Sequence, residues 1–90
     1  MEPNLIHMKY DQIKHHVAAE VRAAIARAGL THKQVAEAIG MAEATFSRRA
    51  NGHTPFSVVD TVLIAVFLGI DPVSLLRMPA EGSALAENAA

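Results

Sequence analysis

Apolar residues recur at helical spacing in the first third of the chain. The first long series consists of Ile13, Val17, Val21, Ala24, Ile25 and Ala28. Spacings of three and four residues place such side chains on one face of a helix, and Gly29 follows where a left-handed glycine ends a helix. The sequence allows three starts for this helix. Asp11 can cap it, or the helix can extend back toward Asn4. In the third alternative, the partly alternating residues 5–10 form a short strand or an ordered arm.

Two short helices joined by a tight turn are predicted next. Thr31 and Gln34 have the spacing of a capping box, in which the threonine hydroxyl accepts from a free backbone N–H and the glutamine reaches back. Gly40 ends this second helix, and a third helix over 43–50 has Phe46 as its one large apolar side chain. The buried face of the second helix is expected to consist of Val35, Ala36 and Ile39.

A strongly apolar fourth helix and a short fifth helix complete the pattern. Ser57 and Asp60 form another capping pair at the start of the apolar stretch 58–68, which Gly69 ends. We expect this helix to belong to the core first and to a partner interface second. The dipeptide Asp71-Pro72 then starts the fifth helix, with Asp as N-cap and Pro at the first helical position.

Composition fixes the fold class and the number of domains. Ninety residues, 51% of them hydrophobic, suffice for one small core, and we expect an all-α, compact bundle of about five helices. The predicted organisation is an N-terminal arm or helix extension over 1–10, a helical domain over 11–78 and a disordered tail over 79–90. The tail begins at a helix-blocking proline and holds mainly Pro, Ala, Glu, Gly, Ser and Asn.

Several protein classes are excluded by what the sequence lacks. The absence of cysteine excludes a disulfide scaffold, thiolate zinc sites and thiol catalysis. The longest apolar run, residues 62–70, falls short of the roughly 20 residues that a membrane-spanning helix needs. The N-terminus has no basic region followed by a long apolar stretch, so a cytoplasmic location is expected.

Charge is segregated along the chain although the formal net charge is only −1. Residues 12–58 carry six basic against three acidic side chains, whereas residues 59–90 carry one basic against four acidic. Four of the five histidines also fall in the basic segment. The near-neutral total therefore does not exclude a nucleic-acid partner, because the basic segment coincides with the two short helices.

The two short helices and their turn have the form of a helix-turn-helix unit. Ala36 is small where the third helix must cross close to the second, and Gly40 allows a positive φ in the turn. Residues 21–76 resemble the lambda-repressor/Cro-type (XRE class) helix-turn-helix DNA-binding domain. The residues that carry this resemblance are Gly29-Leu30-Thr31, Lys33 to Met41, Thr45-Phe46-Ser47-Arg48, Asn51-Gly52 and Val66 to Pro72.

The resemblance implies that the third helix lies in the DNA major groove. Glu43, Ala44, Thr45 and Arg48 are expected on its outer face because Phe46 points inward. Positions matching Glu43, Ala44 and Arg48 reach base edges in the family. Arg48 is the strongest candidate, because a guanidinium can bind guanine O6 and N7 together; Glu43 can accept from cytosine N4 or act as a helix-dipole partner.

Contacts to the DNA backbone are expected around this helix. Basic and polar side chains, together with the free N–H groups at the start of the second helix, would bind phosphates and fix the register. The candidates are His32, Lys33, Ser47, Arg49, Asn51, His53 and Thr54.

Three positions depart from the family pattern. His32 stands where glutamine is usual, and Ala42 occupies an N-cap position that often holds Ser or Thr. Arg49 stands where an apolar residue is common: either its stem packs while its charged head reaches solvent, or the third helix is slightly rotated. These departures concern individual contacts and leave the class unchanged.

The sequence shows no catalytic constellation. It has no metal-ligand cluster, no glycine-rich phosphate loop and no nucleophile–base pair at a recognisable spacing. His15 and His16 point about 100° apart on a helix and cannot chelate one ion together. We therefore expect no enzymatic activity, no metal site and no cofactor.

The function predicted from these features is a transcriptional regulator, Cro-like or a short repressor of phage or bacterial type. It would occlude a promoter by binding a pseudo-palindromic double-stranded DNA operator as a homodimer. The alternatives are an antitoxin of the same fold, whose tail would bind a protein toxin, or a purely protein-binding helical module. Two surfaces are candidates for the dimer: the fifth helix (Val73, Leu75, Leu76, Met78), slightly favoured, or the N-terminal arm (Leu5, Ile6, Met8, Tyr10).

Overall fold

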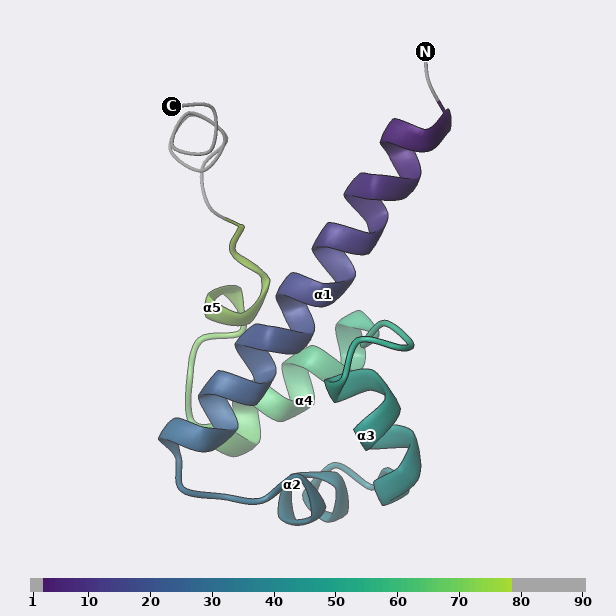
Figure 1. Cartoon of the computed structure of the whole chain (residues 1–90). Helices are drawn as coiled ribbons and strands as arrows, with labels where there is room; N and C mark the ends of the chain where they lie inside the picture. The colour runs from purple at the N-terminus through teal and green to yellow at the C-terminus, as the bar shows by residue number, and fades with distance from the viewer. Residues whose placement is uncertain (1–2, 79–90) are drawn as a thin grey trace.

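The structure is a computed structural model that describes the backbone of residues 3–78 and the side chains of residues 9–78. The predicted disordered tail over 79–90 lies outside this range. The described elements are α1 (Pro3–Arg27), α2 (His32–Ala38), α3 (Glu43–Ala50), α4 (Val58–Leu68) and α5 (Val73–Leu76). All of them are helices, so the predicted all-α bundle of five helices is confirmed (Figure 1).

The longest helix, α1, packs against α3, α4 and α5. It begins at Pro3, so residues 3–10 continue the helix and form neither a strand nor a separate arm. Its N-terminal half projects beyond the other helices, whereas its C-terminal half crosses them (Figure 1). The helix ends at Arg27, and Gly29 follows as the predicted left-handed glycine, with a φ of 72°.

The core lies where α1 faces the other four helices. Phe46 of α3 is fully buried at its centre and contacts the rings of both His32 and Phe56 edge-on. Alanine at several core positions allows the helix axes to approach closely, which a small chain needs to reach a dense interior. The buried cluster consists of Val21, Ala24, Ile25, Val35, Ala36, Phe46, Ala50, Ile64, Ala65 and Leu75.

Helix α4 departs from its predicted place in the core. Its capping box is present, since Ser57 Oγ accepts from the Asp60 N–H at 3.0 Å and Asp60 Oδ2 accepts from the Ser57 N–H at 3.0 Å. Only Thr61, Ile64 and Ala65 of the helix are buried, however. The opposite side of α4 is apolar and exposed, so the expectation that this helix belongs mainly to the core is wrong for half of its surface.

Helix α5 returns the chain against α1. Asp71 Oδ1 accepts from the Val73 N–H at 3.0 Å, which supplies the predicted cap, while Pro72 stands just outside the helix. His16 of α1 forms a hydrogen bond through Nε2 with the Arg77 carbonyl at 2.7 Å, which fixes the end of α5 against α1. Leu75 is only 1% exposed, which corrects its assignment to a dimer surface: its side chain fills the core and is not accessible to a second copy.

Candidate nucleic-acid interface

The start of α2 is fixed by the predicted capping box. Thr31 Oγ1 accepts from the Gln34 N–H at 3.1 Å, and Gln34 Oε1 accepts from the Thr31 N–H at 2.8 Å. These two bonds satisfy backbone donors that the helix cannot pair internally. The first turn of α2, which carries the exposed Lys33, is therefore held at a defined position on the surface.

The turn between α2 and α3 depends on one small residue and one glycine. Ala36 is fully buried in the core between the helices. Gly40 adopts a φ of 73°, and the next N–H, that of Met41, donates to the Ala36 carbonyl at 2.9 Å. This closes α2 with a left-handed C-cap and turns the chain directly into α3.

The outward face of α3 carries the predicted base-contacting side chains. Glu43, Ala44 and Arg48 are exposed, whereas Phe46 and Ala50 are fully buried. Thr45 and Ser47 are half-buried at the edges of this face. The structure thus places the predicted residues on one side of α3, with Thr45 less accessible than the other base-contact candidates.

Three contacts hold α3 against the rest of the bundle. Arg22 of α1 donates through Nη1 to the carbonyl of Ala50, the last residue of α3, at 2.5 Å. Arg49 donates through Nη1 to Asp60 Oδ2 of α4 at 2.7 Å. The third contact is the ring packing of Phe46. Because α3 is fixed at its middle and at its C-terminal end, its outward side chains are presented from a rigid support, as precise recognition requires.

The ion pair explains why arginine stands at position 49. The Arg49 side chain is 28% exposed and that of Asp60 13%, so the guanidinium turns inward toward the carboxylate and not out to solvent. Asp60 Oδ2 accepts from Arg49 and from the Ser57 N–H, which joins the ion pair to the cap of α4. Arg49 is therefore engaged within the fold, which removes the main reason for expecting it at a phosphate.

The other two departures also have structural counterparts. The ring of His32 packs edge-on against Phe46 at 5.6 Å between centroids, so this residue covers the core at the start of α2. Ala42 has the extended backbone of an N-cap, with φ of −62° and ψ of 141°, but makes no side-chain cap bond. The first turn of α3 consequently keeps free backbone donors.

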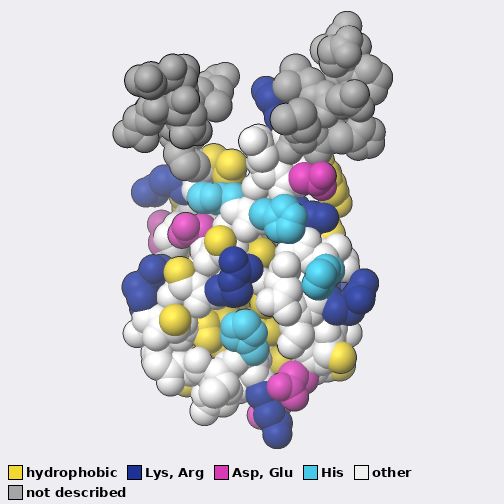
Figure 2. Space-filling model, viewed as in Figure 1, with side chains coloured by type: hydrophobic (Ala, Val, Ile, Leu, Met, Phe, Trp, Pro, Cys, Tyr) yellow, Lys and Arg dark blue, Asp and Glu magenta, His cyan; other side chains and the backbone are white. Residues whose placement is uncertain are grey.

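The remaining backbone-contact candidates surround α3. Lys33, Asn51 and His53 are exposed, and Thr54 is half-buried. Asn51, His53 and Thr54 lie in the loop that follows α3, and Lys33 lies in the first turn of α2. Figure 2 shows Lys, Arg and His side chains spread over the viewed face, while apolar side chains form small separate areas there.

Sequence reasoning missed two residues that position the site. Arg22 was counted only as a basic residue, because its partner at Ala50 lies 28 positions away and leaves no local signal. For His15 the sequence indicates only that it cannot bind one metal ion together with His16. The imidazole ring of His15 occupies the space that a side chain on Gly52 would need, and Gly52 itself has a φ of 83°. The Asn51-Gly52 pair therefore allows α1 to approach the end of α3.

Two further kinds of feature are absent from the described residues. Among the described side chains, those of residues 9–78, no group of three or more His, Asp or Glu is arranged to hold a metal ion. No helix in this part of the chain is long and apolar enough to cross a membrane.

Comparison with known protein families agrees with this geometry. A family model described as a helix-turn-helix domain matches residues 16–78, which include all of α2 to α5 and the C-terminal half of α1. The chain belongs to this helix-turn-helix domain family, a class of DNA-binding domains that is typically non-enzymatic. Comparisons with curated proteins and with solved structures give no match.

Proposed function

We propose that this protein is a sequence-specific transcriptional regulator of the lambda-repressor/Cro type, a short repressor of phage or bacterial origin. It places α3 in the major groove of a double-stranded DNA operator and occludes a promoter. The observation that carries the proposal is the outward face of α3, where Glu43, Ala44 and Arg48 are exposed on a helix that is held firmly from behind. Such a protein acts in the cytoplasm, at the nucleoid.

Arg48 has the central role in this proposal. Its guanidinium can donate two parallel bonds to guanine O6 and N7, the commonest specific contact in the major groove. Ala44 can contact a thymine methyl group, and Glu43 can accept from cytosine N4. Thr45, half-buried at the edge of the face, is a peripheral contact.

Phosphate contacts are proposed to flank this helix on both sides. Lys33 approaches the backbone from the first turn of α2, together with His32 and the N–H groups at that helix end. Ser47, Asn51, His53 and Thr54 approach it from α3 and the loop that follows. We assign Arg49 to the support of α3 and not to a phosphate, because its guanidinium is bonded to Asp60.

A homodimer on a pseudo-palindromic operator fits a domain of this size. One module of this kind buries roughly 600–1,000 Å² on DNA and makes few base contacts, which seldom gives tight specific binding. Two copies on half-sites about one helical turn apart double both the buried area and the number of base contacts.

The test is selection of binding sites from a random DNA pool, followed by binding measurements at several salt concentrations. A specific regulator yields a recurring sequence with two-fold symmetry, and its affinity falls with salt by a log–log slope of roughly −0.9 for each phosphate neutralised. A pool that yields no recurring sequence, or binding that is independent of salt, contradicts the proposal.

A further inference from the structure

The exposed side of α4 is an apolar surface without a partner in the fold. Its members share one half of the helix cylinder, opposite the buried Ile64 and Ala65. We name this surface the α4 face. It consists of Val58, Val59, Val62, Leu63, Val66 and Phe67.

The α4 face is large for a protein of this size. Val58 is 71% exposed, Val66 69% and Val59 66%, and the other three members are between 38% and 46% exposed. Together they present roughly 500 Å² of apolar surface, which is close to the upper end of the largest patch found on a typical monomer. Such contiguous patches mark interaction sites more often than scattered exposed residues do.

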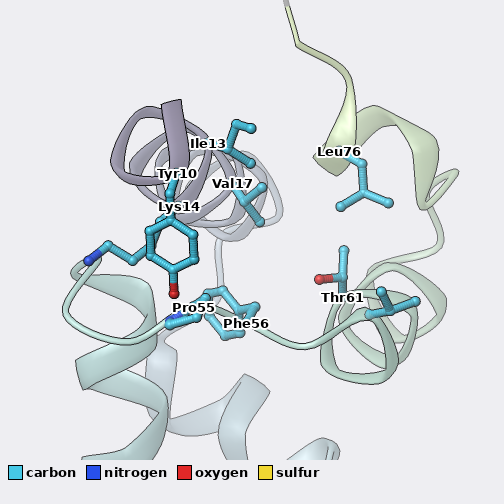
Figure 3. Close-up of a pocket in the computed structure, with 9 residues that line it drawn as sticks. Tyr10, Ile13, Lys14, Val17, Pro55, Phe56, Thr61 and Leu76 are labelled. Atoms are coloured by element: carbon cyan, nitrogen blue, oxygen red, sulfur yellow. The ribbon is translucent and has the colours of Figure 1, made fainter. Parts of the chain in front are cut away.

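A groove extends this surface toward α1 and α5. It has a volume of about 220 Å³ and lies where the start of α4 meets both helices (Figure 3). Val58 belongs both to the α4 face and to the groove lining, so the two surfaces are continuous. Its one charged lining residue, Lys14, has its ammonium 3.7 Å from Asp11 Oδ1. The apolar side chains in this lining are Tyr10, Ile13, Val17, Pro55, Phe56, Val58 and Leu76.

We propose that the α4 face, with the adjoining groove, is the surface on which a second copy of this chain docks. With the exposed parts of Tyr10, Ile13 and Leu76, the apolar surface reaches roughly 800 Å² per copy, which is what each partner contributes to a standard stable interface. This proposal rests on the proposed function, which requires two copies on a symmetric operator.

The charge of the helix favours a second copy over a different protein. The only charged residue within α4 is Asp60, and its carboxylate is already bonded to Arg49 and to the Ser57 N–H. In a two-fold interface each surface meets itself, so any charge near the axis would oppose a like charge. An uncharged face avoids this repulsion and offers no ionic feature by which a dissimilar partner would be recognised.

The residue types on the face also indicate burial in an assembly. Four of its six members are valine, which is a poorer helix former than alanine or the long polar residues used on the exposed sides of other helices here. Stiff β-branched side chains lose little rotamer freedom when a partner covers them. They suit an interface and bring no advantage to a helix surface that stays in water.

The α4 proposal differs from both dimer surfaces predicted from the sequence, which gave helix 58–68 a partner interface only as its second role. Leu75 is buried, which weakens α5 as an independent surface, although Val73 and Met78 are exposed on it. Leu5, Ile6 and Met8 lie outside the described side chains, and the exposed Tyr10 belongs to the groove. In this proposal α5 and α1 contribute only the rim of an interface centred on α4.

The experiment measures the mass of the whole chain in solution without DNA, by sedimentation equilibrium from about 1 µM to about 1 mM. The wild type is expected to dimerise, whereas Val62→Glu and Val66→Glu should raise the dimer dissociation constant about 100-fold or more, because each places a charge inside the interface. Ala26→Glu, the same charge change at an exposed position of α1, is the control and should leave the constant unchanged. Circular dichroism at the lowest concentration checks that each variant keeps its helices.

The proposal is overturned if the wild type stays monomeric throughout or if the glutamate variants still dimerise like the wild type. It is also overturned if a monomer instead binds an unrelated protein through Val62 and Val66. Loss of dimerisation in Val73→Glu alone would place the interface on α5 and also overturn it. Binding to a single operator half-site separates this inference from the proposed function. A monomeric Val66→Glu should keep half-site affinity, and a failure there counts against DNA recognition and not against the interface.

Discussion

Arg49 of α3 and Asp60 of α4 form an ion pair, with 2.7 Å between Nη1 and Oδ2, that connects the candidate recognition helix to the helix behind it. The same carboxylate also caps α4 through the Ser57 N–H. One oxygen atom therefore links the start of one helix to the placement of another. The pair is mostly removed from water, so it is screened less by salt than a surface pair.

Breaking this pair from either side is expected to destabilise the fold. Asp60→Asn can still accept from the Ser57 N–H but leaves the guanidinium without its charged partner, and we expect a loss of about 1–3 kcal/mol in unfolding free energy. Urea denaturation of Asp60→Asn, Arg49→Met and the double variant measures the coupling. The double variant should lose less than the sum of the single variants; strict additivity would mean that the pair contributes nothing.

Arg48→Ala is expected to weaken operator binding by about 1–3 kcal/mol and to relax the preference at one base pair of each half-site. The reason is the loss of paired bonds to one base, while the fold is unaffected because the side chain is exposed. Binding to the selected operator and to its single-base variants measures both effects. Arg27→Ala removes the same charge at an exposed position in the last turn of α1, and the prediction fails if it changes the base preference equally.

Lys33→Ala is expected to act differently from Arg48→Ala. A phosphate contact contributes equally to all sequences, so affinity should fall uniformly across operators and unrelated DNA. The log–log salt slope should become shallower by about 1. A selective loss at the operator, with the slope unchanged, would assign Lys33 to a base.

Ala42→Ser is expected to stabilise the protein. The backbone at position 42 already has N-cap geometry, and a serine hydroxyl can accept from a free N–H in the first turn of α3, which contributes about 1 kcal/mol. Thermal and urea unfolding measure the gain. Ala44→Ser, which places the same residue inside α3 where it cannot cap, is the control; a similar gain there would show that capping is not the cause.

Gly40→Ala is expected to cost about 1–2 kcal/mol, because a φ of 73° is strained for an L-residue with a Cβ. No atom lies within 4 Å of the position that this Cβ would take, so the loss comes from the backbone alone. Gly40→Asn should lose less, because asparagine tolerates the left-handed region. Unfolding measurements on both variants test whether backbone strain is the cause. Equal losses of unfolding free energy would indicate a steric clash instead.

Local signals account for the parts of the fold that the sequence predicted well. The capping box of Thr31 and the glycines at positions 29, 40 and 69 encode helix ends within a few residues, and α2 to α4 begin and end as predicted. The inward orientation of Phe46 followed from the α3 pattern in the same way. The start of α1 at Pro3 could not be predicted, because residues 5–10 fit several structures equally well.

Contacts between distant residues account for what the sequence did not reveal. Arg22 with Ala50, and His16 with Arg77, are 28 and 61 positions apart, so no spacing pattern connects them. The sequence predicts core first and partner interface second for residues 58–68, because hydrophobicity alone does not distinguish a side chain covered within the chain from one left exposed. Only the packing of α1 and α2 against α4 leaves its valines exposed while Ile64 and Ala65 are covered.

The proposed base contacts and the packing contacts of α3 belong to different residues. Within the part of the chain that the structure describes, the side chains of Glu43, Ala44 and Arg48 make no hydrogen bond or ion pair, whereas Phe46, Arg49 and Ala50 are engaged in the fold. A set of three side chains can therefore be exchanged without disturbing the bundle. If the proposed base contacts hold, retargeting the domain to a new DNA sequence calls for mutations on this face alone, with the buried residues unchanged.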